Sequence, residues 1–379
     1  MIDNSFVKVE FYKHNLGQEE LDSVAALLRG VFLTTGPLTK SFEFGLADYL
    51  GGGYAIGVSS CTSALFLSLV GLGIGPGDEV ITTPMTFVAT ANAIIEAGAK
   101  PVFVDVEKNT GNMDASLIKE AITPQTKAVI PVHLYGQMCD MRAIRSVAER
   151  YGLKIIEDAA HCLEGVRDGL RPGTLSDAAC FSFYATKAIT SGEGGAVFTR
   201  NEELAAGLRN LRSHGIDKDA SLRYGAGYRH WDMVNFGYKA NMCDVQAAFL
   251  IPQIKRIEDR LKMRAVAAET YRRAFSGMPG LELPDVLPDT THAHHLFTAW
   301  VDPGKRDRYL EKLEGQGIGV AVNYRPVHLT SFYKRTFGYK EGMFPNAERI
   351  GKRTISLPLY PSITRDEINE VVEAMGRIL

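Results

Sequence analysis

Short runs rich in β-branched residues alternate with helix-like segments through the first two thirds of the chain. The runs predict strands at residues 54–58, 79–83, 101–105, 128–132, 154–157, 178–182 and 196–199. Between several of them, apolar residues recur three and four positions apart and predict helices, as at 87–97, 117–121 and 141–151. This alternation predicts an α/β fold with a mainly parallel sheet covered by helices on both faces. In such sheets ligands bind beyond the carboxyl ends of the strands, where we expect the functional site.

The character of the sequence changes after a long helical pattern at 244–275. Residues 277–288 hold Gly280 and three prolines, and they predict a linker or edge segment. A strand is predicted at 297–301, a helix at 307–316, and a last helix after the capping box formed by Thr364 and Glu367. The sequence therefore predicts a large domain, residues 1–250, and a smaller C-terminal α/β domain, residues 251–379.

Composition and charge exclude several classes of protein. The formal net charge of -2 provides no global basic field for a nucleic acid or an anionic membrane. The five cysteines are scattered and form no CxxC pair, which argues against a disulfide framework or a zinc knuckle. The uncharged stretch 49–77 is interrupted by small polar residues and glycines, so its apolar part is too short for the roughly 20 residues of a membrane span. Since the N-terminus lacks the apolar core of a signal peptide, we expect a cytoplasmic protein.

Polar residues follow two of the predicted strands. Residues 59–63 read Ser-Ser-Cys-Thr-Ser at the start of an apolar helix, where they can bind a phosphate or simply cap the helix. Asp158 ends a hydrophobic run. Its carboxylate can cap the following turn, or it can hold a protonated ring nitrogen of a cofactor by a charge-assisted hydrogen bond.

Lys187 and Phe87 also admit two interpretations each. Lys187 is either a surface lysine or an amine whose pKa is lowered by apolar surroundings, suited to forming a Schiff base. Phe87 is either a core residue or a ring that stacks on a planar group. The glycines at 71–77 follow a predicted helix and precede a strand, the reverse of the order in a dinucleotide-binding fold, which excludes that type of site.

Ordered motifs along nearly the whole chain resemble the sugar-nucleotide aminotransferases of the DegT type, which are pyridoxal phosphate (PLP) enzymes of fold type I. The motifs are LTTGP at 33–37, PGDEVI at 76–81, TFVAT at 86–90, PVH at 131–133, EDAAH at 157–161, FSF at 181–183, GEGG at 192–195 and SLPLYP at 356–361. The resemblance implies PLP as the cofactor. It also implies a large domain with a mixed, mainly parallel sheet between helices, and a smaller C-terminal domain.

The resemblance implies a role for each matching residue. Lys187 would form the internal aldimine with PLP and then carry the proton between substrate and cofactor carbons. Asp158 would keep the pyridine nitrogen protonated, Phe87 would stack on the ring, and His161 would lie near the phenolic oxygen. The family's dehydratases have lost the Schiff-base lysine, usually to histidine, so Lys187 argues against that branch.

The cofactor phosphate would be bound at the start of the helix after residue 60. The residues that the resemblance assigns to it are Thr62, Ser63 and Ser182. Many members have Gly-Thr-Ala where this chain has Cys61-Thr62-Ser63, and Cys61 is interpreted as a packing residue. Many members also supply an Asn and an Arg to the phosphate from the neighbouring subunit. Lys239 and Asn241 occupy those positions here, and either can bind an anion.

The resemblance further implies a homodimer with an active site at each subunit boundary. It implies ping-pong transfer of the amino group of L-glutamate to a nucleotide-linked keto-sugar. A keto-cyclitol of an aminoglycoside pathway is an alternative acceptor, and a non-catalytic PLP-binding regulator is an alternative of another class. His328 either contacts the sugar-nucleotide or is a solvent-facing loop residue. The cluster His292, His294 and His295 lacks companion ligands, and no metal is expected.

Overall fold

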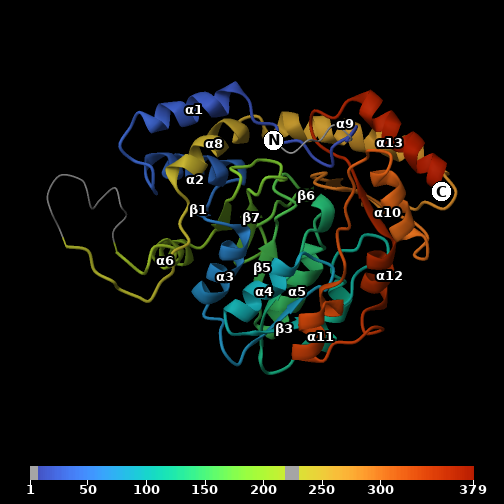
Figure 1. The fold of residues 1–379 in the computed structure, drawn as a ribbon. Helices are drawn as coiled ribbons and strands as arrows, with labels where there is room; N and C mark the ends of the chain where they lie inside the picture. Colours follow the sequence, from blue (N-terminus) through green and yellow to red (C-terminus); the bar gives the residue numbers. More distant parts are fainter. Residues whose placement is uncertain (1–6, 218–229) are drawn as a thin grey trace.

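A seven-stranded sheet forms the centre of the computed structural model, which describes residues 7–217 and 230–379 (Figure 1). Its strands, in spatial order, are β1 (Tyr54–Val58), β8 (Gly195–Thr199), β7 (Ala178–Ser182), β5 (Lys154–Asp158), β4 (Thr126–Ile130), β2 (Glu79–Thr82) and β3 (Lys100–Phe103). The strands from β7 to β3 are parallel, whereas β8 is antiparallel to both of its neighbours. The predicted mixed, mainly parallel sheet is confirmed.

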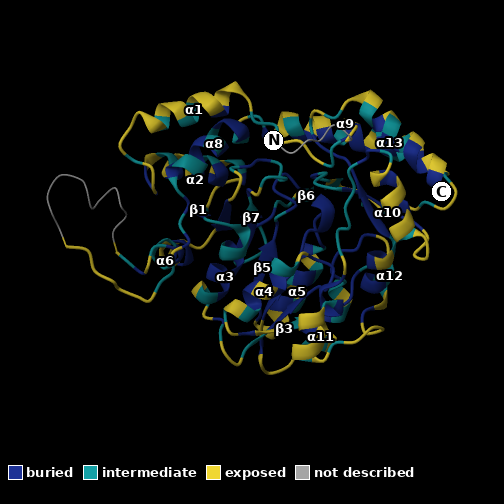
Figure 2. Ribbon diagram, in the orientation of Figure 1, coloured by how far each residue is buried: buried dark blue, intermediate teal, exposed yellow. Residues whose placement is uncertain are grey.

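Helices cover both faces of this sheet because side chains alternate between the faces along each strand. On one face, Ile56, Ile156 and Val197 pack against α3 (Cys61–Gly71), α4 (Val88–Glu96) and α6 (Glu202–Leu211). On the other face, α2 (Pro37–Tyr49) and α8 (Asp244–Ile254) cover β1, β8 and β7, while α5 (Met141–Tyr151) and the 3-10 turn η1 (Ala115–Ala121) cover β2, β4 and β5. The strands are buried and the outer helix surfaces are exposed (Figure 2).

The C-terminal part builds a second core around a two-stranded antiparallel sheet. Its strands β10 (Phe297–Trp300) and β11 (Thr354–Leu357) pack with α9 (Ile257–Phe275), α10 (Arg306–Glu314) and α13 (Arg365–Ile378). Val9 belongs to the same core and forms a parallel bridge with Ile318. The segment that starts the described chain therefore packs on the C-terminal part, although it precedes the large sheet in sequence.

The remaining elements are short or peripheral. They are α1 (Gln18–Leu28), α11 (Ser331–Phe337), α12 (Pro345–Arg353), β6 (Val166–Arg167), β9 (Thr290–Thr291) and the 3-10 turns η2 (Leu134–Gly136) and η3 (Val327–Leu329). Strand β6 pairs with β9, and Val327, Tyr333 and Ile350 share a core with Met85 and Phe103. The part of the chain that forms the seven-stranded sheet and the C-terminal part thus share one hydrophobic cluster.

Two helical predictions differ from the structure. The pattern at 244–275 forms two helices, α8 and α9, instead of one. Pro252 near the end of α8 has no N–H to donate to the carbonyl of Ala248, which weakens the helix just before the break. The segment at 117–121 forms only the 3-10 turn η1. In contrast, the capping box is confirmed, since Thr364 Oγ1 accepts from the N–H of Glu367 at 3.1 Å and Glu367 accepts from the N–H of Thr364 at 2.8 Å.

The apolar stretch after residue 64 is buried as part of α3 between the sheet and its neighbouring helices. None of the helices in the described residues is both long enough and apolar enough to cross a membrane.

Candidate active site

A cavity of about 530 Å³ opens at the carboxyl ends of β1, β2, β5 and β7. Its volume lies in the range of sites that bind small molecules. Loops after these strands, the start of α3 and residues from the C-terminal part line the cavity together. Six of the residues predicted from the sequence lie in its wall: Thr62, Phe87, Asp158, His161, Ser182 and Lys187. The topology of the sheet therefore brings together side chains that are up to 125 positions apart, from Thr62 to Lys187.

Asp158 ends β5 and is only 6% exposed. Its Oδ2 accepts a hydrogen bond from Thr90 Oγ1 at 2.7 Å, and its Oδ1 accepts one from the N–H of Ala160 at 3.1 Å. Thr90 lies in α4 and also pairs with Thr86, with 2.7 Å between the hydroxyl oxygens. These contacts hold the carboxylate in the cavity wall, so that it can also meet a cationic group of a ligand.

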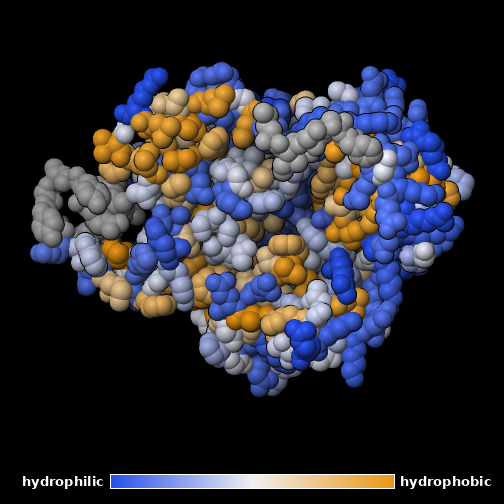
Figure 3. Space-filling view, in the orientation of Figure 1, coloured by the Kyte–Doolittle hydropathy of each residue, from blue (hydrophilic) through white to orange (hydrophobic). Residues whose placement is uncertain are grey.

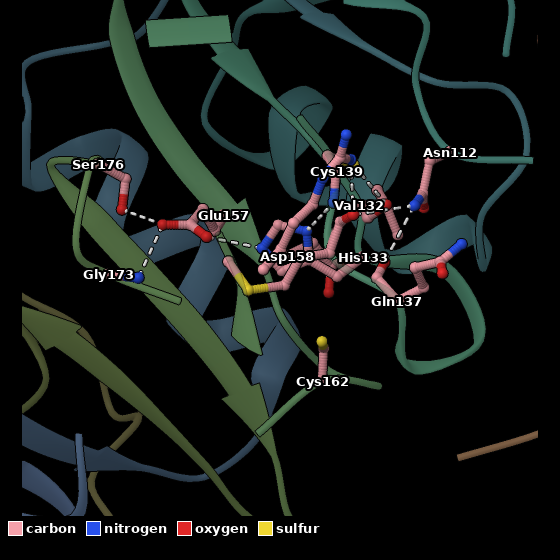
Figure 4. A network of polar contacts seen from close by, with 12 residues as sticks. Asn112, Val132, His133, Gln137, Cys139, Glu157, Asp158, Cys162, Gly173 and Ser176 are labelled. Carbon is pink, nitrogen blue, oxygen red and sulfur yellow. Dashed lines mark hydrogen bonds and ion pairs between the residues drawn. The ribbon is translucent and has the colours of Figure 1, made fainter. Parts of the chain in front are cut away.

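The end of β5 is held from behind by a buried polar network (Figure 4). Glu157 accepts hydrogen bonds from Ser176 Oγ at 2.5 Å and from the N–H of Gly173 at 2.7 Å, and it lies 2.6 Å from His133 Nε2. The backbone N–H of His133 donates to the carbonyl oxygen of Asp158 at 3.1 Å. The network therefore connects the loop after β4 to the strand end that carries Asp158.

The start of α3 combines both interpretations of residues 59–63. Ser60 is the N-cap, since its Oγ accepts from the N–H of Ser63 at 3.0 Å. Ser63 does not line the cavity, whereas Thr62 does. The backbone of Gly195 in β8 lies close to the start of α3: a Cβ at this position would be 2.5 Å from the nitrogen of Cys61. Capping thus involves Ser60 and Ser63, while Thr62 is free to meet an anion at the helix N-terminus.

Cys61 is the first residue of α3 and also lines the cavity. Burial raises the pKa of its thiol well above the ordinary value, with a further contribution from the charge of Asp158. The thiol therefore stays protonated near neutral pH, which agrees with its interpretation as a packing residue.

Lys187 lies in the turn that follows β7, with its side chain in the cavity wall. Burial lowers the pKa of its amine to about 8, although the nearby Cys61 and Asp158 act in the opposite direction. Its Nζ lies 3.3 Å from His295 Nε2. Of the two interpretations from the sequence, the position matches a buried amine that can lose its proton near neutral pH.

His161 lies between two rings at the wall of the cavity. Its Nδ1 accepts from the N–H of Tyr135 at 3.3 Å, and its Nε2 is 3.0 Å from the hydroxyl oxygen of Tyr324. Burial and the charge of Lys187 lower the pKa of the imidazole well below its ordinary value. Since Nδ1 accepts a hydrogen bond, the neutral ring carries its hydrogen on Nε2 and donates it to Tyr324.

Phe87 caps α4 and is 58% exposed, although most large apolar side chains nearby are buried. It lines the cavity and tilts toward Tyr324, with 6.1 Å between the ring centroids. The core interpretation of Phe87 is therefore wrong. An exposed ring in the wall of this cavity is suited to stacking on a planar ligand.

Besides Ser63, three predicted site residues lie outside this cavity. Lys239 and Asn241 hydrogen-bond to each other beside the end of β1, where Asn241 also donates to Thr35 Oγ1 at 2.6 Å. His328 is fully buried, with Nε2 3.0 Å from a carboxylate oxygen of Glu348. The interpretation of His328 as a solvent-facing residue is wrong, because this carboxylate binds the imidazole inside the hydrophobic cluster shared by the two parts. Its predicted contact with a sugar-nucleotide gains no support from this position.

Sequence reasoning missed several cavity residues. Thr90, Tyr184, His295 and Tyr324 line the cavity, as do Phe11 and Tyr12 from the N-terminal segment. In the sequence, His295 stands out only as a member of the cluster with His292 and His294. His292 and His294 stack on each other at 4.6 Å, whereas His295 faces Lys187. Over the ranges 7–217 and 230–379, no group of three His, Cys, Asp or Glu side chains is arranged to hold a metal ion.

Comparison with known proteins gives consistent results. Residues 14–376 match the model of the DegT/DnrJ/EryC1/StrS aminotransferase family. The chain is 46% identical over 370 residues to the spore coat polysaccharide biosynthesis protein SpsC of Bacillus subtilis (strain 168), covering 96% of this chain and 95% of SpsC.

Two solved structures are similar over nearly the whole chain. DesV of S. venezuelae, solved in complex with a ketimine intermediate, has a TM-score of 0.88 and 36% identity, covering 95% of this chain and 94% of DesV. The protein Spr1654 of Streptococcus pneumoniae, in its PMP form, has a TM-score of 0.93 and 30% identity, covering 98% of this chain and 99% of that protein.

Proposed function

Because the chain belongs to the DegT/DnrJ/EryC1/StrS aminotransferase family, we propose that it transfers the amino group of L-glutamate to a nucleotide-linked keto-sugar, using PLP bound in the cavity. The observation that supports this most is the meeting of Lys187, Asp158 and the start of α3 in one cavity wall. The names of its relatives agree with a role in making amino sugars for polysaccharides or glycosylated metabolites, since SpsC acts in spore coat polysaccharide biosynthesis.

The residues of the cavity fit PLP chemically. When bound, PLP supplies an aldehyde that condenses with amines and a protonated pyridine ring that withdraws electrons from the reacting carbon. Lys187 offers an amine, Asp158 a carboxylate for the ring nitrogen, and Phe87 an exposed ring face. Thr62 in the first turn of α3 and Ser182 at the end of β7 offer hydroxyls for the phosphate. The absence of a side chain at Gly195 keeps β8 close to this helix start.

Lys187 is the residue that moves the proton in this proposal. Its amine has a pKa of about 8, so near neutral pH Nζ can both release a proton and take one up. Asp158 has a static role: its charge keeps a proton on a ring nitrogen, while Thr90 and Ala160 keep the carboxylate in place.

The acceptor sugar would bind at the mouth of the cavity. Tyr12 and Tyr184 line the cavity and are about half exposed, so their rings can cover a sugar or a base. Tyr12 comes from the N-terminal segment and Tyr184 from the loop after β7. The two tyrosines belong to separate segments of the chain, so a change of sequence in either segment can alter which acceptor binds.

The active form in this proposal is a homodimer. Exposed apolar side chains gather on α1, α2 and the connection between them: Leu21, Leu28, Val31 (93% exposed), Leu33 and Phe44 (77% exposed). They belong to an apolar patch on the surface of the molecule (Figure 3). Such patches mark association surfaces, and a second copy of the chain is the occupant that we propose. Lys239 and Asn241 lie outside the cavity of their own chain, and in a dimer they would reach the phosphate of the partner's cofactor.

A substrate panel tests this function directly. Purified protein loaded with PLP is mixed with L-glutamate and nucleotide-linked keto-sugars, and the amino sugars and 2-oxoglutarate formed are measured by mass spectrometry. Equal amounts of both products with at least one keto-sugar are expected. If no nucleotide-linked keto-sugar is aminated, while a keto-cyclitol is aminated under the same conditions, the sugar-nucleotide assignment is wrong.

A further inference from the structure

His295 is the residue that contacts the amine of Lys187. Its Nε2 lies 3.3 Å from Lys187 Nζ, and both side chains line the cavity. Among the residues for which the structure gives positions, His295 is the one hydrogen-bond partner of Nζ. The two residues are 108 positions apart, so the contact depends entirely on the docking of the C-terminal part against the large sheet.

The backbone around His295 is fixed on the turn that follows β4. The N–H of His295 donates to the carbonyl oxygen of Tyr135 at 3.1 Å, and the N–H of Ala293 donates to the carbonyl oxygen of Gly136 at 2.8 Å. Gly136 has a φ of 111°, and a Cβ there would lie 2.9 Å from the nitrogen of His294. The two segments therefore lie in close backbone contact, which fixes where the imidazole of His295 can point.

The imidazole of His295 is surrounded by groups that keep it neutral. It packs against His161, with 4.3 Å between the ring centroids. Burial lowers its pKa well below the ordinary value, and the charges of Lys187 and Arg264, together with His161, act in the same direction. Arg264 reaches this loop from α9, where its Nε donates to the carbonyl oxygen of Ala293 at 3.2 Å. A neutral imidazole can accept a hydrogen bond at Nε2 and carry its hydrogen on Nδ1.

The charged groups that face Lys187 define what this contact does. Asp158 and Cys61 raise the pKa of the amine, whereas burial and the charge of Lys187 lower the pKa values of His161 and His295 and keep both rings neutral. With a pKa of about 8, the lysine is mostly an ammonium at pH 7 and must donate its hydrogens. His295 Nε2 is the acceptor within reach, so this hydrogen bond stabilises the ammonium in its partly buried position.

We propose that His295 is a positioning residue that accepts a hydrogen bond from Lys187 Nζ whenever the lysine is not joined to the cofactor. The hydrogen bond holds the free amine in the cavity wall and keeps it basic enough to take up a proton. This inference rests on the proposed function for its importance in turnover, whereas the contact itself joins two side chains of the chain. Without this acceptor the ammonium loses a stabilising hydrogen bond, while burial still lowers its pKa, so the amine becomes a weaker base.

Three substitutions at position 295 separate the hydrogen bond from simple packing. His295→Gln can place an amide group near the position of Nε2, whereas His295→Asn places its amide near Nδ1 and cannot reach Nζ. His295→Phe keeps a ring against His161 but has no acceptor. His292→Asn is the matched control, because it changes a histidine in the same loop and keeps the acceptor that binds the N–H of His294 at 2.9 Å.

The readout is the protonation of Lys187 in the full chain freed of cofactor. Trace labelling with acetic anhydride is followed from pH 6 to 11, and the peptide containing Lys187 is quantified by mass spectrometry. Each profile is divided by its own plateau at high pH, which removes differences in solvent access. Relative to wild type, His295→Phe and His295→Asn should label roughly fivefold faster at pH 7, since a hydrogen bond to the ammonium is lost. His295→Gln and His292→Asn should follow the wild-type profile.

Two results would overturn the inference. One is a profile for both His295→Phe and His295→Asn that matches wild type, and the other is a His295→Gln profile that matches His295→Phe. If His295→Phe does not fold, the comparison of the Asn and Gln variants still decides. The labelling requires no amino donor or acceptor. The labelling profiles can therefore agree with the inference in a protein that shows no transamination, and they can disagree with it in a protein that does. A failure of the inference is thereby distinguished from a failure of the proposed function.

Discussion

Thr90 and Asp158 join β5 and α4 at the cavity, with the threonine hydroxyl donating to Asp158 Oδ2 at 2.7 Å. The carboxylate sits at the end of β5 and the hydroxyl on α4, so the hydrogen bond fixes the acid relative to the segment that also carries Phe87. The pair orients a negative charge toward any ring held beside Phe87.

Replacing this charge should nearly abolish turnover. In Asp158→Asn the amide keeps the shape of the side chain but cannot hold a cationic ring nitrogen, so the electron-withdrawing power of the ring is lost. We expect kcat to fall on the order of 10³-fold, the scale seen when an electrostatic group of an active site is removed. Thr90→Val, which removes only the neutral donor, should have a smaller effect. Turnover of Asp158→Asn within a few-fold of wild type would show that another group serves the ring.

Burial of the Lys187 amine should cost stability in the cofactor-free protein. Its folded pKa of about 8 lies below the ordinary value of about 10.4, so the folded state binds the proton less tightly than the unfolded state. We expect Lys187→Met to raise the free energy of unfolding at pH 7 by up to about 3 kcal/mol. The advantage of the variant should shrink as pH rises from about 8 to about 10.4 and vanish above, because both states are then neutral. Denaturant unfolding of both proteins at pH 7, 9 and 11 measures this; an advantage that is independent of pH contradicts the assignment of burial as its cause.

The network behind β5 should be important for stability. Glu157 is fully buried and accepts hydrogen bonds from Gly173 and Ser176 beside its contact with His133. Glu157→Gln puts an amide donor where one of these donors points, and we expect a loss of about 2–4 kcal/mol in the free energy of unfolding. Glu149→Gln removes a carboxylate from an exposed ion pair with Arg145 and should change stability by less than about 0.5 kcal/mol. If both variants lose the same free energy of unfolding, the buried network contributes no more to stability than an exposed ion pair.

The exposed patch on α1 and α2 should hold two copies together. Phe44→Glu places a charge in the patch, and we expect a shift from dimer to monomer in light scattering after size-exclusion chromatography. The monomer should also bind PLP more weakly, because it would lose the proposed contact of Lys239 and Asn241 of the partner subunit with the phosphate. Phe332→Glu, which alters an exposed ring on α11, serves as the control and should remain a dimer. If Phe44→Glu remains a dimer, the interface between the two copies lies on another surface.

Local patterns predicted the parts of the fold that depend on local chemistry. The β-branched runs marked each of the seven sheet strands, since fully buried strands need apolar residues on both faces. Strand β11 was missed because its four residues are followed at once by Pro358 and show no separate pattern. Asp158 and Lys187 stand at or shortly after the end of a buried strand, where ligands of such sheets bind, and both lie in the cavity.

Contacts between distant segments could not be predicted in this way. His295 meets Lys187 only after the C-terminal part has docked, and the sequence around it shows nothing but a cluster of histidines. The burial of His328 depends on Glu348, whose pairing with it requires η3 and α12 to pack together. The same holds for Phe87, because its place in the cavity wall depends on segments that are distant in the sequence.

Borohydride trapping tests the central claim most directly. Protein reconstituted with PLP is reduced with borohydride, digested, and searched by mass spectrometry for the modified peptide, with and without prior incubation with L-glutamate. We predict that the cofactor is fixed to Lys187, and that glutamate abolishes this trapping because the amino group has passed to the cofactor. Trapping at another lysine, or no trapping at all in a folded protein exposed to PLP, would contradict the account.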